Sequence, residues 1–185
     1  YKYFCDKKYF EVATEGVWRQ IRYHDPEQVL PPSLLPSPEV YFATCLQNKE
    51  VWPIWRYLEE YDEQTLFSVI EILYDHIGVY NNETDEFENE AQKVEFAELI
   101  NNILRAYKEG YYLEPTNGFI MQMPNGALRE QLEYDCSDLP DLVYEQLATA
   151  TKMYYRFDAN FEQKKKAINI LADILESQRE EVKDI

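Results

Sequence analysis

Histidine is the side chain best suited to moving a proton near neutral pH, and this chain has two, His24 and His76. Arg19 precedes His24 with four residues between them, so a cation and a proton carrier occur in one short segment. On an ideal helix, residues at this spacing point about 140° apart, so they share a face only if the helix ends there. The Asp-Pro dipeptide after His24 favours such an end. The same spacing also arises by chance, and Arg19 is then a surface cation near a helix C-terminus.

The second histidine follows Asp75 directly and lies two residues before Gly78. Asp75 and His76 together can form half of an acid-base pair. A histidine at the end of an apolar helix is also typical of a structural residue with satisfied hydrogen bonds, or of a cation that faces the helix C-terminus.

Metal and cofactor chemistry has no motif in this sequence. The chain has five glycines and no glycine-rich phosphate loop, His-Glu-x-x-His, Glu-x-x-His or Gly-x-Ser-x-Gly segment. Cys5, Cys45 and Cys136 are widely separated and form no Cys-x-x-Cys pair, which argues against a disulfide framework or a zinc knuckle. We expect no cofactor and no metal, and a protein of the reducing cytoplasm. No apolar run is long enough to cross a membrane.

The chain is strongly acidic, with 35 Asp and Glu residues against 18 Lys and Arg residues and a net charge of -17. Such a surface repels phosphate backbones and disfavours a basic groove for nucleic acid. The segment from Glu59 to Glu98 contains thirteen acidic residues and one basic residue, Lys93. This region is either a solubilising face or a docking face. If it is a docking face, the chain is an interaction or inhibitor protein that mimics nucleic acid.

Sixteen tyrosines add a third alternative, because tyrosine is enriched at protein interfaces. The chain is then a helical adaptor that binds a protein partner or forms a homodimer. The candidate partner-binding residues are acidic or aromatic, and they are Glu83, Asp85, Glu86, Glu88, Glu90, Tyr111 and Tyr112.

The pattern of apolar and turn residues predicts a mainly α-helical fold, a helical bundle with one small β-hairpin and a C-terminal antiparallel helix hairpin. We expect an N-terminal helical segment over residues 1–60 and a helical domain over residues 61–185. Residues 1–10 are predicted to form a strand or an arm, and residues 31–38 a proline-rich linker. Within the first part, helices are expected over residues 11–23, 38–47 and 52–60, with Ser37 and Pro38 starting the second.

In the second part, Asp62 is predicted to cap a helix that runs to residue 77 and buries Leu66, Val69, Ile70 and Leu73. Residues 80–90 are read as a polar loop, and the hairpin is expected near 111–123 because Asn117-Gly118 suits a tight turn. The remaining helices are expected over residues 88–108, 140–157 and 161–183. Their predicted apolar faces are Ala91, Val94, Leu99, Ile103 and Tyr107 in the first, and Ile168, Leu171 and Leu175 in the last.

Two segments of the second part carry a resemblance to a known family. A helix ends in Ile100-Asn101-Asn102-Ile103-Leu104-Arg105, and a small β excursion with Gly118 and a helix hairpin follow. The last helix contains an Ala-Ile-x-x-Leu-Ala-x-x-Leu-Glu segment over residues 167–176. Over about residues 90–185 the chain resembles bacterial abortive-infection proteins of the HEPN class.

That resemblance implies an α-helical domain, often dimeric, that cuts RNA during phage infection without a metal. Members of the class carry an Arg-x4-6-His motif near the end of the domain, where the arginine stabilises a phosphorane-like charge and the histidine moves a proton. No such motif follows residue 176 in this chain, and Arg19 and His24 lie outside the region of resemblance. Because the chain opens on Tyr1 and stops within a charged helical pattern, we expect a catalytic, RNA-contacting segment beyond Ile185, or else a non-catalytic relative.

Overall fold

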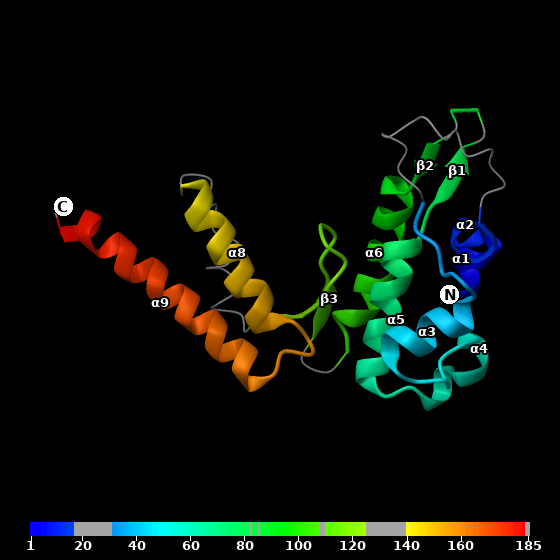
Figure 1. Cartoon of the computed structure of the whole chain (residues 1–185), viewed down its shortest axis with the longest axis horizontal. Helices are drawn as coiled ribbons and strands as arrows, with labels where there is room; N and C mark the ends of the chain where they lie inside the picture. The colour runs from blue at the N-terminus through cyan, green and yellow to red at the C-terminus, as the bar shows by residue number, and fades with distance from the viewer. Residues whose placement is uncertain (17–30, 82, 85, 108–109, 125–139, 184–185) are drawn as a thin grey trace. The chain divides into compact units, whose positions relative to one another are not determined.

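The fold is mainly helical, with small antiparallel sheets between the helices (Figure 1). The structure is a computed structural model that describes all residues except 17–30, 82, 85, 108–109, 125–139 and 184–185. Its elements are α1 Lys2–Asp6, α2 Glu11–Glu15, α3 Pro38–Leu46, α4 Ile54–Tyr57, the 3-10 helix η1 Leu58–Glu60, α5 Glu63–His76, β1 Val79–Asn81, β2 Glu86–Glu88, α6 Glu90–Leu104, β3 Tyr111–Leu113, β4 Ile120–Gln122, α8 Asp141–Tyr155 and α9 Phe161–Lys183. The predicted fold class is confirmed.

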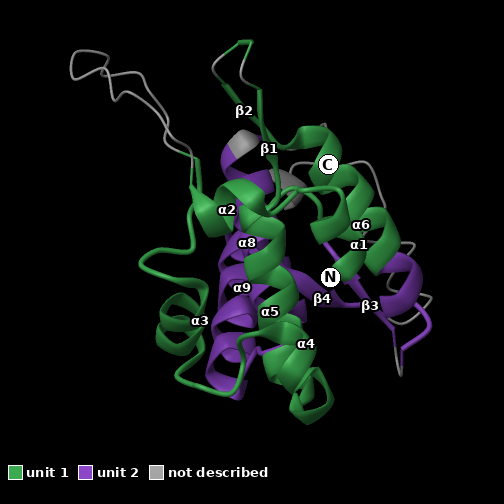
Figure 2. Cartoon of the chain, turned by 90° about the vertical axis from the view of Figure 1, so that its right-hand side faces the viewer, with its two compact units in different colours: residues 1–100, 115–118 green, residues 101–114, 119–185 purple. Residues whose placement is uncertain are grey.

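The chain divides into two compact units (Figure 2). Unit 1 contains residues 1–100 and 115–118, and unit 2 contains residues 101–114 and 119–185. The division falls within α6, so the predicted boundary near residue 60 lies inside unit 1.

The first residues of unit 1 form a helix, which differs from the strand or arm expected there. The reason is a local aromatic core: the Phe4 ring of α1 lies 4.8 Å from the Phe96 ring of α6, between ring centres. The proline-rich segment is irregular but is not a free linker. Leu34 is fully buried, and its backbone N–H donates to the Ala13 carbonyl at 2.8 Å.

Two helices of unit 1 begin where side-chain caps were predicted. The Ser37 hydroxyl accepts a hydrogen bond from the Val40 N–H at 3.4 Å, and Pro38 occupies the first helical position of α3. The Asp62 carboxylate accepts from the Thr65 N–H at 2.7 Å, and hydrogen bonds from the Thr65 side chain and then from this N–H lower the pKa of Asp62. Each cap supplies a partner for one of the backbone donors that the first turn of a helix leaves free.

A second β-hairpin lies where a polar loop was predicted over residues 80–90, so that loop prediction was wrong, while the predicted hairpin near residues 111–123 is present. Strands β1 and β2 pair antiparallel, with Val79 opposite Glu88 and Asn81 opposite Glu86. The ring of Phe87 packs directly on Gly78, where an added Cβ would lie 2.2 Å from a ring atom. The sequence did not predict this hairpin because its strands lack alternating apolar residues. The contact between Phe87 and Gly78 stabilises the hairpin instead.

The apolar face predicted for α6 was also wrong. Val94 and Ile103 are more than half exposed, whereas Phe96, Ala97 and Leu104 are buried. In unit 1, Phe96 packs against the aromatic rings of Phe4 and Tyr74, and this choice of neighbours sets the buried face.

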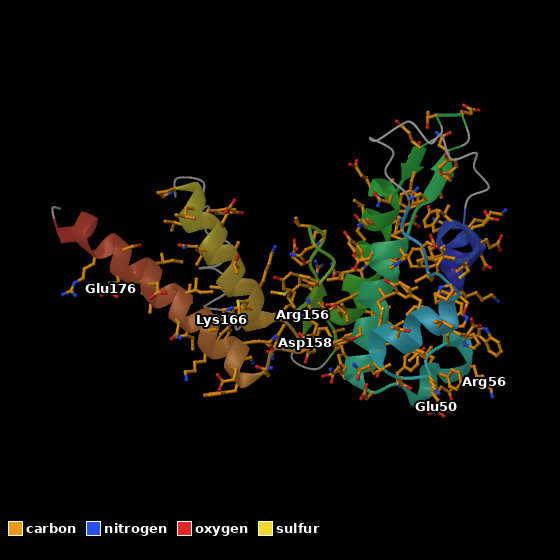
Figure 3. The ribbon with its side chains drawn as sticks, viewed as in Figure 1. Glu50, Arg56, Arg156, Asp158, Lys166 and Glu176 are labelled. Carbon is orange, nitrogen blue, oxygen red and sulfur yellow. The ribbon has the colours of Figure 1, made fainter. Side chains whose placement is uncertain are left out.

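Unit 2 joins a hairpin to the C-terminal helix pair. Strands β3 and β4 pair antiparallel, and the Phe157 N–H donates to the Ile120 carbonyl at 3.1 Å, which connects the hairpin to the turn after α8. At that turn Arg156 donates to the Asp158 carboxylate at 2.7 Å and lies 4.1 Å above the Phe119 ring centre (Figure 3).

Helices α8 and α9 pack against each other as the predicted helix hairpin. The buried face of α9 differs from the predicted one, because Ala167 is fully buried while Ile168 and Leu175 are exposed. Leu171 is half-buried. Successive residues of a helix point about 100° apart, so the face that buries Ala167 leaves its neighbour Ile168 exposed.

Candidate functional site

Arg19 and His24, the pair with the Arg-x4-6-His spacing, lie outside the described residues. The other histidine, His76, is buried at the end of α5. Its Nδ1 lies 2.8 Å from the Ile72 carbonyl, and its ring packs edge-on against Tyr41 with 5.0 Å between ring centres.

These contacts give His76 a structural role within the helix end. The neighbouring Asp75 carboxyl has a raised pKa because it is partly buried, an effect that Lys93 and His76 oppose. A general acid or base must reach a substrate, and the His76 side chain is buried.

The predicted acidic residues gather on the β1–β2 hairpin and the start of α6. Glu83, Glu86, Glu88 and Glu90 are all exposed, and Asp85 lies outside the described residues. The Glu88 carboxylate accepts a hydrogen bond from the Asn81 side chain at 2.8 Å, across the hairpin. We call these four exposed carboxylates the exposed acidic hairpin. Their side chains are accessible, as those of a docking face must be.

The two predicted tyrosines do not form an exposed surface. Tyr111 is buried on β3, and Tyr112 is half-buried. Burial raises the pKa of Tyr112. Tyr111 therefore presents little surface to a partner, whereas Tyr112 keeps part of its surface exposed, and a partner-binding role for the two residues stays a prediction.

A residue of the family-like segment has a defined structural role. The Asn101 side chain donates from Nδ2 to the Leu113 carbonyl at 3.0 Å and accepts from the Leu113 N–H at 2.6 Å. The amide of Asn101 thus pairs with β3 as a neighbouring strand would. This contact links the end of α6 to the hairpin within unit 2.

A polar cluster that the sequence did not single out surrounds Glu95 of α6. Its carboxylate accepts hydrogen bonds from the Tyr3 hydroxyl at 2.6 Å and the Tyr9 hydroxyl at 2.9 Å, and it pairs with Lys7. The Lys7 ammonium also lies 4.7 Å from the Tyr3 ring centre. We call these four residues the Glu95 cluster. The alternating aromatic and basic residues near the N-terminus were its only signal in the sequence.

The Glu95 cluster predicts an acid-sensitive contact between α1 and α6. Hydrogen bonds from Lys7, Tyr3 and Tyr9 lower the pKa of Glu95 from 4.5 to about 2. A carboxylate with a depressed pKa stabilises the fold above its unfolded pKa and loses that effect as the pH falls through its folded pKa. We expect Glu95→Gln to unfold at a lower temperature than wild type at pH 7, and the difference to shrink between pH 4.5 and about 2.

Thermal unfolding of both proteins across that pH range measures the effect. Glu98→Gln, at an exposed position of the same helix, is the matched control and should follow wild type at every pH. A Glu95→Gln difference that stays constant down to pH 2 would contradict the role of the ionised carboxylate.

The fold and these contacts define a mainly helical protein with two small hairpins, whose polar clusters hold its elements together. None of the helices in the described ranges combines the length and apolar composition needed to cross a lipid bilayer. The same residues contain no group of three or more His, Cys, Asp or Glu side chains arranged to hold a metal ion. No family model matches the chain, and neither the curated proteins nor the solved structures give a match.

Proposed function

We propose that this chain is an RNA-directed helical part of a HEPN-type protein in a bacterial antiphage system, acting in the cytoplasm. One observation supports the proposal: residues 101–105 of the first family-like segment and residues 167–176 of the second belong to the same structural unit, unit 2. Asn101 of the first segment holds the hairpin through β3, and residues 167–176 of the second lie on α9 within the C-terminal helix pair. These contacts support the proposal because they keep the two segments that carry the resemblance within one unit.

Catalysis in this proposal depends on an arginine and a histidine with the Arg-x4-6-His spacing. The chain contains one such pair, Arg19 and His24, and a segment beyond Ile185 is the alternative source. The arginine would stabilise the charge that develops on the phosphoryl group, and the histidine would transfer the proton of the attacking hydroxyl. Neither role needs a metal.

RNA cleavage by the purified protein, with its source reading frame extended past Ile185, tests the proposal. We expect cleavage in the presence of a chelator and its loss when the histidine of the downstream motif is replaced by alanine. The His24→Ala variant in the same protein shows whether the N-terminal pair contributes. An extended protein without the motif and without cleavage would exclude the nuclease function.

The exposed acidic hairpin favours a second candidate function, that of a non-catalytic interaction or inhibitor protein. Its four described carboxylates and the net charge of -17 suit a basic partner. Binding of a polylysine peptide should weaken steeply between low and physiological salt. Replacing Glu83, Glu86, Glu88 and Glu90 by glutamine should remove most of that binding, and an unchanged affinity would exclude this surface.

A further inference from the structure

One face of α9 stays exposed along most of the helix. Phe161, Ile168 and Leu175 have 77%, 53% and 73% of their surfaces exposed, and Ala172 is exposed as well. At about 100° per residue, these four side chains point within about 60° of one another. We call them the α9 strip. Helix α8 packs on a different face of α9, on which Ala167 is fully buried, and the α9 strip is a narrow apolar stripe of the kind that forms the seam between two paired helices.

Charge divides α9 into a basic first half and an acidic second half. Lys164, Lys165 and Lys166 lie in the first half, and Asp173 and Glu176 lie in the second (Figure 3). Lys165 and Glu176 are both exposed and lie on the same side of the α9 strip, about 60° and 80° from Ile168 around the helix. A parallel second α9 would set like charges against each other, whereas an antiparallel one sets opposite charges together.

We propose that the α9 strip binds a second copy of this chain, with the two α9 helices antiparallel. A single register, centred on residue 170, places Ile168 opposite the partner's Ala172 and Phe161 opposite the partner's Arg179. The same register sets the stem of Lys165 along the partner's Leu175 and its ammonium near the partner's Glu176. Two-fold symmetry repeats every contact, so the surface is complementary to itself.

Each of these contacts has a physical basis. Alanine opposite isoleucine lets two helices approach closely, and an arginine over an aromatic ring gains a cation-π interaction. Arg179 is exposed and lies on the same face of α9 as Phe161, about five turns away. This inference goes beyond the RNA-directed function and holds whether or not the chain cuts RNA.

Sedimentation velocity of the whole chain over a range of concentrations tests the proposal. Wild type should shift from monomer to dimer as concentration rises. Ile168→Glu places a charge at the centre of both halves of the interface, so we expect dimerisation at least about tenfold weaker. Because position 168 is exposed in the monomer, the variant should keep its helical circular dichroism.

A charge exchange tests the antiparallel register directly. Lys165→Glu and Glu176→Lys should each weaken the dimer about fivefold, because each sets like charges together at two sites. The double variant should restore wild-type affinity. The matched control exchanges Lys166→Glu with Asp173→Lys, two residues at least about 140° from Ile168, and should leave the dimer unchanged.

A wild-type chain that stays monomeric at the highest concentration would overturn the proposal and assign the α9 strip to another protein or another segment. A dimer that the charge exchange does not restore would overturn the antiparallel pairing. A dimer weakened equally by the control exchange would place the interface elsewhere.

Discussion

Replacing Asn101 by alanine is expected to lower the free energy of unfolding by about 3 kcal/mol, because buried backbone groups left without partners cost about 1–3 kcal/mol each. Asn101 satisfies both the N–H and the carbonyl of Leu113, whose side chain is fully buried. Alanine removes both hydrogen bonds at once. Urea unfolding followed by circular dichroism, with linear extrapolation to water, measures the loss.

The neighbouring asparagine supplies the control. Asn102 is exposed on α6, so Asn102→Ala should change stability by no more than about 0.5 kcal/mol. Asn101→Asp separates the two hydrogen bonds, since a carboxylate still accepts from the Leu113 N–H but cannot donate to its carbonyl. Its stability should lie between those of wild type and Asn101→Ala. Equal losses for Asn101→Ala and Asn102→Ala would contradict the strand-like role of Asn101.

Gly118→Ala is expected to lower the free energy of unfolding by about 2–5 kcal/mol, the sum of a backbone cost and a packing cost. Gly118 has φ +72°, a left-handed conformation that disfavours a side chain. A Cβ there would lie 2.4 Å from Cδ1 of Tyr74. Tyr74 cannot move away easily, because its ring is buried and its hydroxyl donates to the Pro115 carbonyl at 2.5 Å.

Gly16→Ala separates the two costs. Gly16 has a similar φ of +76°, but a Cβ there would meet no atom within 4 Å. Its ψ of -176° places it in a region that is essentially restricted to glycine, so its loss is a backbone cost alone, about 1–3 kcal/mol. The same urea unfolding experiment compares the variants. A loss at Gly118→Ala of only about 1–2 kcal/mol, the backbone cost alone, would mean that the contact with Tyr74 contributes nothing.

The sequence predicted the features that depend on neighbouring residues. Ser37 and Asp62 begin their helices through hydrogen bonds to backbone three residues away, and Asn117-Gly118 supplies the turn of the β3–β4 hairpin. The last helix was predicted with the bounds that the structure shows, residues 161–183. Caps and turns act within four residues along the chain, so the sequence alone contains the information that places them.

The sequence did not predict correctly which faces α6 and α9 bury. On α9 apolar residues occupy more than half of the circumference, so periodicity permits several faces and the packing of α8 against Ala167 selects one. On α6 the aromatic rings around Phe96 select the buried face in unit 1. Burial follows from which neighbours are present, and a single helix does not specify its neighbours.

The candidate sites divide in the same way. The sequence by itself determined the net charge, the acidic region from Glu59 to Glu98 and the segment from Ile100 to Arg105 that contains Asn101. Composition and the order of neighbouring residues do not depend on the fold. Only the tertiary structure decided that Tyr111 is buried, that Asn101 pairs with Leu113, and that Glu95 collects donors from residues more than 80 positions away. Contacts between distant residues form only when packing brings them together, and that packing is a property of the whole chain.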